Sequence, residues 1–293
     1  MQLDELNKII QNAGGQCFAL GYAESLLEKI NRTESVDGHE VLITQFQAAR
    51  EEGDLRGRVL EINFASLFVE NDAALKYGAK QGMRGDVDFC WEIGGRQIFI
   101  EMKLLGQDQK TRAEINQQLE ANGFSKKVIS NDTWDVVARI QRDIFGKSST
   151  TKFNPHPQAT WVNLVAIDVS ELQLGTVDLA DCLLAAAGNE VAAKYCNPLC
   201  LRPNVVGVFE HRDVCSPRAE QKEWVNGFRP TSYVEQHPRD YIHGVLFLFR
   251  EPKERAALCY QLSGYVVWNS RLVDVQAGAE FCKAFHRIVP FAK

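Results

Sequence analysis

Residues 86–103 read DVDFCWEIGGRQIFIEMK, two alternating segments joined by Gly94-Gly95. A pair of glycines between alternating segments is typical of a β-hairpin, because tight hairpin turns need positive φ angles that glycine adopts easily. A two-residue turn here also fixes which residues face each other. The expected partners are Ile93 with Arg96, Trp91 with Ile98 and Phe89 with Ile100.

One face of this hairpin is apolar. Side chains alternate between the two faces of a strand, so every second residue shares a face. We expect the apolar face to belong to the hydrophobic core. It consists of Phe89, Trp91, Ile93, Ile98, Ile100 and Met102.

The other face of the hairpin places two carboxylates opposite each other, because the same register pairs Asp88 with Glu101 and Asp86 with Lys103. Like charges on facing strands destabilise a sheet, so this pair requires a bound cation or a raised pKa. Mg²⁺ or Mn²⁺ suits hard oxygen ligands, and Lys103 can orient or deprotonate a water. These are the requirements of metal-assisted phosphodiester hydrolysis. The alternative is that the charges form only the solvated side of an antiparallel hairpin.

Glu61 is an acid on an apolar helical stripe. Phe64, Ala65 and Phe68 follow it at three, four and seven residues, which places all four on one side of a helix. Glu61 is then either an edge residue with its carboxylate in water or a third carboxylate directed toward a metal.

The order of these elements resembles the PD-(D/E)xK nuclease superfamily. An acidic helix, an aspartate strand, a turn, a Glu-x-Lys strand, a helix and an apolar strand follow one another over roughly residues 55–170. The matching residues are Asp88 and Glu101-Met102-Lys103, while Val87 stands where the motif has proline. The resemblance implies that Asp88 and Glu101 bind Mg²⁺ or Mn²⁺, that Lys103 assists the attacking water and that Glu61 joins the site. It also implies an α/β, restriction-endonuclease-like fold with a mixed β-sheet flanked by helices.

The remaining sequence completes a mixed α/β pattern. Apolar residues at helical intervals predict helices through residues 1–75, and residues 197–240 are rich in proline and polar residues, so we expect loops there. We expect an N-terminal helical part over 1–54 and a nuclease-like α/β domain over 55–293, in one continuous globular unit. Further helices are expected over 111–121, 132–145 and 277–289, and strands over 161–169, 241–249 and 265–269.

The composition is that of a folded protein without a membrane anchor. Hydrophobic residues make up 45% and charged residues 24% of the 293 positions. No apolar run approaches the roughly 20 residues that span a bilayer, and the first twenty residues lack a secretory pattern. We therefore expect a cytoplasmic protein that does not enter the membrane. Both a monomer and a homodimer are compatible with the sequence.

Contact with nucleic acid needs a local basic patch, because 33 basic residues stand against 38 acidic ones and the net charge is −5. In the helix expected over 132–145, the apolar stripe leaves Arg139 and Arg142 on the other side. These arginines either contact phosphates or are only solvated. Lys147 and Gln107 are further candidate contacts, and Lys152 belongs to the same basic region.

Eight cysteines are too few for a disulfide scaffold in a chain of this length. The candidate ligands of a zinc ion are Cys196, Cys200, His211 and Cys215. The alternative, which is the more common outcome, is that the cysteines are buried thiols.

The sequence thus predicts a metal-dependent nuclease, a DNA endonuclease of restriction or DNA-processing type, with nucleic acid as its partner. A catalytically inactive binding or scaffolding protein on the same fold is the main alternative. A zinc-stabilised recognition module is a second.

Overall fold

The computed structural model describes most of the chain. The described residues are 1–13, 22–81, 85–106, 114, 117–118, 121, 133–147, 152–154, 156–170, 177–197, 201, 205–210, 237–252 and 260–291. The chain forms two compact units. The first contains Met1–Leu104, Gly146–Asp168 and Val234–Lys293, and the second contains Leu105–Phe145 and Val169–Tyr233.

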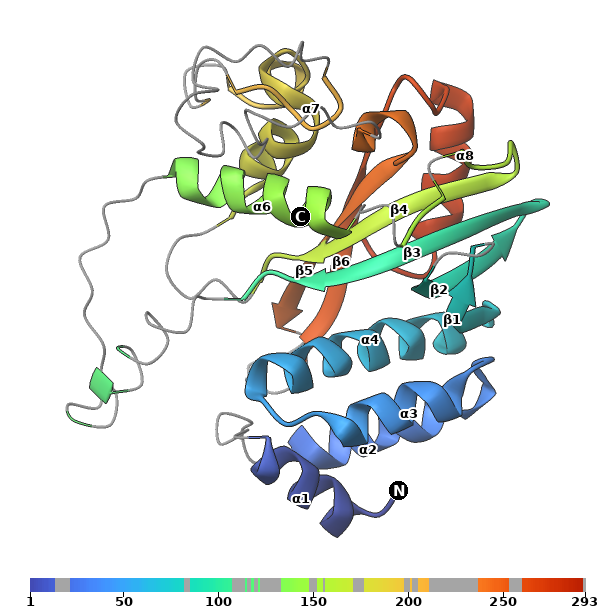
Figure 1. The fold of residues 1–293 in the computed structure, drawn as a ribbon, viewed down its shortest axis with the longest axis vertical. Coiled ribbons are helices and arrows are strands. Elements are labelled where there is room, and N and C mark those ends of the chain that lie inside the picture. The colour runs from blue at the N-terminus through green and yellow to red at the C-terminus, as the bar shows by residue number, and fades with distance from the viewer. Residues whose placement is uncertain are drawn as a thin grey trace. The chain divides into compact units, whose positions relative to one another are not determined.

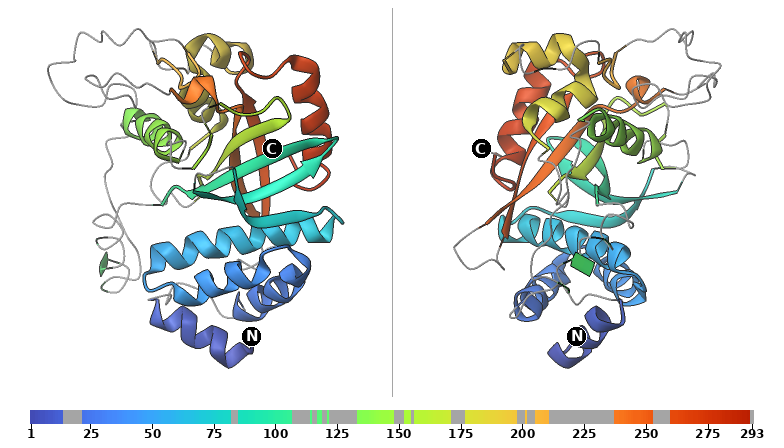
Figure 2. Two further views of the ribbon diagram at one scale, coloured as in Figure 1. Left: turned by 45° about the vertical axis from the view of Figure 1, so that its right-hand side comes forward. Right: turned by 90° about the vertical axis from the view of Figure 1, so that its left-hand side faces the viewer.

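The first unit begins with a layer of helices (Figure 1). These are α1 (Leu3–Asn12), α2 (Tyr22–Arg32), a short 3₁₀ helix (Thr33–Ser35), α3 (His39–Ala48) and α4 (Glu52–Glu70). In both views of Figure 2, α4 lies next to the sheet, and α1 lies on the far side of the layer. The prediction of helices in this part is confirmed, but α4 ends at Glu70 rather than continuing to Leu75.

A six-stranded mixed sheet forms the centre of this unit. Its strands, in spatial as well as chain order, are β1 (Leu75–Lys80), β2 (Asp86–Ile93), β3 (Arg96–Leu104), β4 (Trp161–Asp168), β5 (Gly244–Pro252) and β6 (Tyr260–Trp268). β3, β4 and β5 are parallel to one another, and the other neighbouring pairs are antiparallel. This arrangement confirms the predicted α/β class and the three further strands.

The β2–β3 hairpin has the predicted register over its five paired positions, but the predicted pairs Asp88–Glu101 and Asp86–Lys103 are not part of the ladder. Ile93 pairs with Arg96, and the ladder continues to Phe89 and Ile100. Gly94 and Gly95 have φ angles of 57° and 75°, which a two-residue hairpin turn requires and which glycine adopts without a Cβ clash.

The apolar face of the hairpin lies in the main core, as predicted. Phe89 and Ile100 are fully buried there, and Trp91 contacts Phe68 of α4 and Phe281 of α8 (Val275–Phe285) at ring-centroid distances of 5.4 and 5.7 Å. Packed aromatic pairs of this kind bury large apolar areas. Helices α4 and α8 are thereby attached to the same side of the sheet.

The second unit contains most of α6 (Thr133–Lys147) and all of α7 (Leu179–Tyr195). Gln141 of α6 donates hydrogen bonds from Nε2 to the carbonyl oxygens of Ala185 and Val206, at 3.2 and 2.7 Å. α7 is kinked at Gly188, whose φ of 76° is not helical. The helix predicted over 132–145 is therefore confirmed as α6.

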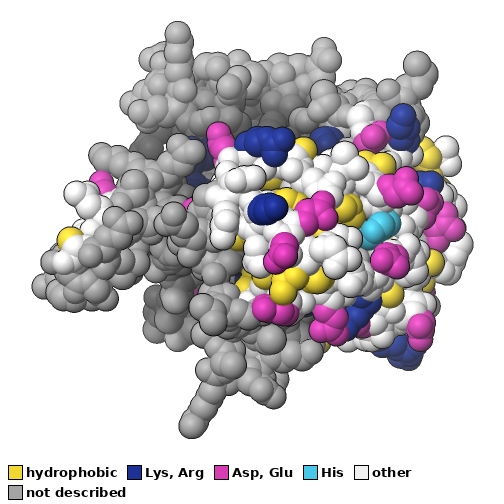
Figure 3. All heavy atoms as spheres, turned by 90° about the horizontal axis from the view of Figure 1, so that it is seen from below, with side chains coloured by type: hydrophobic (Ala, Val, Ile, Leu, Met, Phe, Trp, Pro, Cys, Tyr) yellow, Lys and Arg dark blue, Asp and Glu magenta, His cyan; other side chains and the backbone are white. Residues whose placement is uncertain are grey.

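Among the described α-helices and strands, β1 and α7 were not predicted. The helix expected over 111–121 lies mostly outside the described residues, as does most of the expected loop-rich stretch over 197–240. No helix in the described ranges is long and apolar enough to span a membrane. On the face seen from the side of α1, acidic and basic side chains are interspersed over the described surface (Figure 3).

Candidate active site

Asp88 and Glu101 lie where the β2–β3 ladder ends. The last paired residues are Phe89 and Ile100, and Asp88 and Glu101 are the next residues outward on the two strands. Asp88 Oδ2 accepts a hydrogen bond from the backbone N–H of Met102 at 2.7 Å. The aspartate is thereby held against the Glu101-Met102-Lys103 segment, in the neighbourhood that the sequence predicts.

The polar face of the hairpin is only partly solvated. Asp86 and Glu92 are exposed, whereas Cys90 and Phe99 are buried and Glu101 has no solvent-accessible surface. A carboxylate inside the protein is costly unless a cation or hydrogen bonds compensate it. The alternative prediction, that these charges form only the solvated side of the hairpin, is therefore wrong for Glu101.

Lys152 supplies a cation beside Glu101. Its Nζ lies 3.6 Å from Glu101 Oε1 and donates a hydrogen bond to the carbonyl oxygen of Asp86 at 2.9 Å. From the sequence, Lys152 could be assigned only to a basic region, because no local pattern links it to Glu101, 51 positions earlier in the chain. Lys103, two residues after Glu101 on β3, is half-buried.

Glu61 lies in a hydrogen-bonded network on α4. Both of its carboxylate oxygens are 3.0 Å from Arg58 Nη1, and Tyr77 of β1 donates from its hydroxyl to Oε2 at 2.8 Å. Glu61 is 7% exposed, so it is not an edge residue with its carboxylate in water. The interpretation of Glu61 as a solvated edge residue is therefore wrong, and its interpretation as a metal-directed carboxylate stays a prediction.

The pKa of Glu61 is raised to about 7. Burial is the largest cause, and repulsion from the Asp88 carboxylate is the second, while Arg58 and Tyr77 act in the opposite direction. Glu61 and Asp88 are therefore electrostatically coupled. Burial and the Glu61 charge raise the pKa of Tyr77, so its phenol stays protonated and can donate.

The raised pKa of Glu61 predicts a pH-dependent stability. An unfolded glutamate releases its proton near its ordinary value of 4.5, whereas folded Glu61 keeps it up to about pH 7. The folded protein thus binds more protons in this window, and the free energy of unfolding falls as pH rises. We expect wild type to lose on the order of 1–3 kcal/mol relative to Glu61→Gln between pH 5 and pH 8. Urea unfolding at both pH values measures this difference.

The matched control for this measurement is Glu40→Gln, which changes an exposed glutamate of the neighbouring helix α3. Its stability should follow that of wild type at both pH values. A Glu61→Gln profile parallel to wild type would show that Glu61 ionises with an ordinary pKa.

Asp88 and Glu101 carry oxygen donors of the kind that Mg²⁺ prefers. In the part of the chain that the structure describes, no group of three or more His, Cys, Asp or Glu side chains could hold a metal ion. Mg²⁺, however, is commonly bound by one or two carboxylates, with waters and substrate phosphates completing its shell. Asp88 and Glu101 supply two such carboxylates at one end of the hairpin. The grouping of Glu61 with them around a metal stays a prediction.

The candidate nucleic-acid contacts are only partly described. Arg139 Nη2 donates to the carbonyl oxygen of Gly106 at 2.5 Å, so this guanidinium is tied to backbone in the second unit, whereas Arg142 is exposed. Lys147 closes α6, but its side chain is not described, and Gln107 lies outside the described residues. Phosphate binding by these residues stays a prediction.

The candidate zinc set has one described member. Cys196 is a half-buried free thiol after α7, and burial raises its pKa. Cys200, His211 and Cys215 lie outside the described residues.

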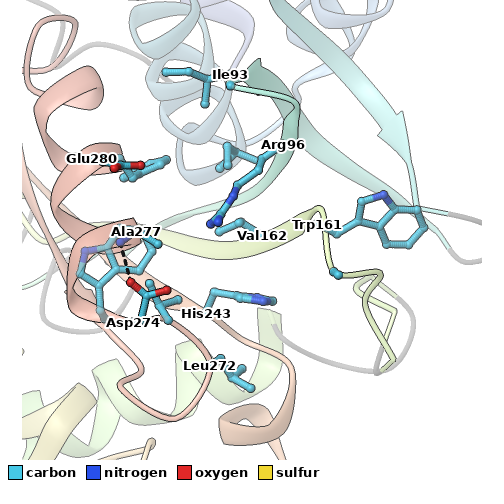
Figure 4. A pocket seen from close by; sticks show the side chains of 15 residues that line it. Ile93, Arg96, Trp161, Val162, His243, Leu272, Asp274, Ala277 and Glu280 are labelled. Atoms are coloured by element: carbon cyan, nitrogen blue, oxygen red, sulfur yellow. Dashed lines mark hydrogen bonds between the residues drawn. The ribbon is translucent and has the colours of Figure 1, made fainter.

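A separate pocket of about 230 Å³ lies at the opposite end of β3 (Figure 4). Arg96 reaches toward His243, with Glu280 and Asp274 of the α8 region across from them. Burial lowers the pKa of His243 to about 4, and its Nδ1 accepts the backbone N–H of Asn163 at 3.0 Å. A neutral imidazole therefore lines this pocket, which contains none of the residues of the Asp88–Glu101 site.

Comparisons of the chain with protein-family models, with curated proteins and with solved structures found no match.

Proposed function

We propose that this protein is a Mg²⁺- or Mn²⁺-dependent nuclease that hydrolyses phosphodiester bonds, with DNA as its preferred substrate. The observation that carries the proposal is the hydrogen bond between Asp88 and the Met102 amide, which joins the aspartate strand to the Glu-x-Lys strand. Through this bond the Asp88 carboxylate of β2 contacts the backbone of β3, the strand that carries the buried Glu101 and Lys103.

The order of elements supports the resemblance to the PD-(D/E)xK superfamily. The helix that bears Glu61 is followed by β1, β2 with Asp88, β3 with Glu101 and Lys103, α6 and β4. The six-stranded mixed sheet with helices is compatible with a restriction-endonuclease-like fold. We therefore propose, together with the activity, that the chain has this fold and is a member of this superfamily.

Each residue has a distinct role in the proposed reaction. Asp88 and Glu101 would hold the cation, which when bound neutralises charge on the phosphate as a Lewis acid. Lys103 positions the attacking water and stabilises the developing negative charge. Glu61, with a pKa of about 7, can hold or accept a proton near neutral pH beside Asp88.

The polar face of the hairpin is hollowed nearer to its turn. A hollow of about 720 Å³ runs along β1, β2 and β3 and includes Glu92, Gln97 and Phe99, which share their face with Glu101, although Asp88, Glu101 and Lys103 do not line it. Placement of the acids and the lysine on strands keeps their relative positions rigid, as a catalytic set requires.

The proposal predicts metal-dependent cleavage. Purified protein with Mg²⁺ or Mn²⁺ should cut supercoiled plasmid and linear DNA faster than RNA, and a chelator should stop the reaction. Lys103→Ala should lower the initial rate by about 100-fold or more, the usual contribution of a group that assists proton transfer. Lys283→Ala, on an exposed position of α8, should cleave at the wild-type rate. Equal cleavage by wild type and Lys103→Ala would remove Lys103 from the mechanism.

One observation favours the second candidate, a catalytically inactive nuclease-fold protein that binds or scaffolds. Glu101 already has a cation of the protein, Lys152, within 3.6 Å. A site neutralised by the protein itself needs no metal. This candidate predicts binding of nucleic acid without cleavage, and no Mn²⁺ affinity that Asp88→Ala removes.

A further inference from the structure

Lys152 occupies a defined position at the candidate site. Its ammonium bridges the two strands of the hairpin beyond the end of their ladder, contacting the Asp86 carbonyl on β2 and the Glu101 carboxylate on β3. The Glu101 side chain is 0% exposed, and that of Lys152 is 36% exposed. One partner is thus fixed in the interior, and the other retains a path to solvent.

The backbone that carries Lys152 is anchored in the first unit. Phe153 is fully buried, and the Asn154 N–H donates to Gln81 Oε1 at 2.6 Å. Gln81 Nε2 in turn donates to Asn163 Oδ1 of β4, also at 2.6 Å. The lysine therefore points at the site from a held segment, and its contact with Glu101 is part of the packing.

We propose that Lys152 is a built-in competitor for the metal. In the metal-free protein its ammonium neutralises the buried Glu101 carboxylate, and it must give up this contact when a divalent cation takes Glu101 as a ligand. Opposite charges at such a distance attract strongly where water is scarce, and two cations beside one carboxylate repel each other. Lys152 thereby sets the metal concentration at which the site fills. This inference rests on the proposed function, because it assigns Glu101 to the metal.

The test is the affinity for Mn²⁺, measured by calorimetry on the full chain. Lys152→Gln keeps a donor for the Asp86 carbonyl but removes the charge, and we expect it to bind Mn²⁺ roughly three- to tenfold more tightly, in keeping with a part-exposed ion pair. Lys152→Arg should bind within about twofold of wild type, because it keeps the cation. Lys80→Gln is the matched control: it removes an exposed lysine from β1 opposite Asp86, and it should leave the affinity unchanged.

A second readout separates competition from a merely structural role. Without metal, Lys152→Gln should melt at a lower temperature than wild type, and saturating Mn²⁺ should raise its melting temperature more than that of wild type. Lys152→Met, of similar length but without a polar end, should behave in the same way.

The outcomes distinguish the two proposals. If wild type binds Mn²⁺, Glu101→Gln loses that binding and Lys152→Gln binds no more tightly than wild type, the metal site stands and the role of Lys152 is wrong. If Glu101→Gln binds Mn²⁺ as well as wild type does, Glu101 is not a ligand of the metal, and the proposed competition by Lys152 is wrong as well. Absence of Mn²⁺ binding in both wild type and Lys152→Gln overturns both proposals.

Discussion

Glu101→Gln is expected to lower the rate of DNA cleavage by on the order of 10²–10³-fold. The amide has nearly the shape of the carboxylate, so the packing around this fully buried side chain is retained. The change removes the negative charge that would hold the cation on β3. It also leaves the Lys152 ammonium without its ionic partner at 3.6 Å, which adds positive charge where a metal would bind. Initial rates of plasmid cleavage at saturating Mg²⁺ measure the effect.

The matched control for this substitution is Glu92→Gln. Glu92 lies on the same face of the same hairpin, but it is exposed and its Oε1 accepts a hydrogen bond only from Gln97, at 3.0 Å. We expect cleavage at the wild-type rate. Circular dichroism and melting temperatures show whether both variants are folded. Wild-type activity in Glu101→Gln would mean that the catalytic site lies elsewhere.

The hairpin could be predicted in detail because its information is local. The two glycines specify the turn, the alternation specifies the faces, and the turn length then fixes every pair. The observed register from Ile93–Arg96 to Phe89–Ile100 follows from these features alone. Helix α4 was predicted for a similar reason, since its apolar stripe is a local pattern.

β1 and α7 were missed because their local patterns are weak. β1 is a six-residue edge strand with lysines at two of its positions and a glycine inside. Lysines are common on edge strands, where they discourage pairing with other chains, but they dilute the apolar signal. α7 is rich in alanine, which gives little periodic contrast, and its kink at Gly188 interrupts the helical pattern.

The contacts of the candidate site could not be predicted from the sequence. Glu61 was recognised as an acid on an apolar stripe, but the network that buries it involves Tyr77 on β1, a strand that the sequence did not reveal. Lys152 reaches Glu101 across 51 positions of the chain, and only the fold brings them together. Long-range pairs of this kind leave no periodic trace, so Asp88, Glu101 and Lys103 could be proposed from the sequence, whereas the contacts with Tyr77 and Lys152 could not.

The last prediction decides which aspartate belongs to the site. Asp88→Asn should reduce cleavage by on the order of 10²-fold or more, because the substitution removes a carboxylate charge from the proposed metal site. The asparagine oxygen can still accept the Met102 N–H, so the end of the hairpin should keep its geometry. Asp86→Asn is the matched control, since Asp86 is exposed and contacts Lys152 only through its backbone carbonyl. It should cleave as wild type does.

Asp88→Asn also has a consequence that does not depend on catalysis. The Asp88 charge is the second largest cause of the raised pKa of Glu61. Without that charge Glu61 should ionise at a lower pH in the folded protein, so the fall in unfolding free energy should end at a lower pH and be smaller than in wild type. Urea unfolding across pH 5–8 measures this shift, and Asp86→Asn should not produce it. Loss of cleavage in Asp86→Asn with normal cleavage in Asp88→Asn would place the metal on Asp86, because the charge essential for activity would then lie two residues earlier on β2.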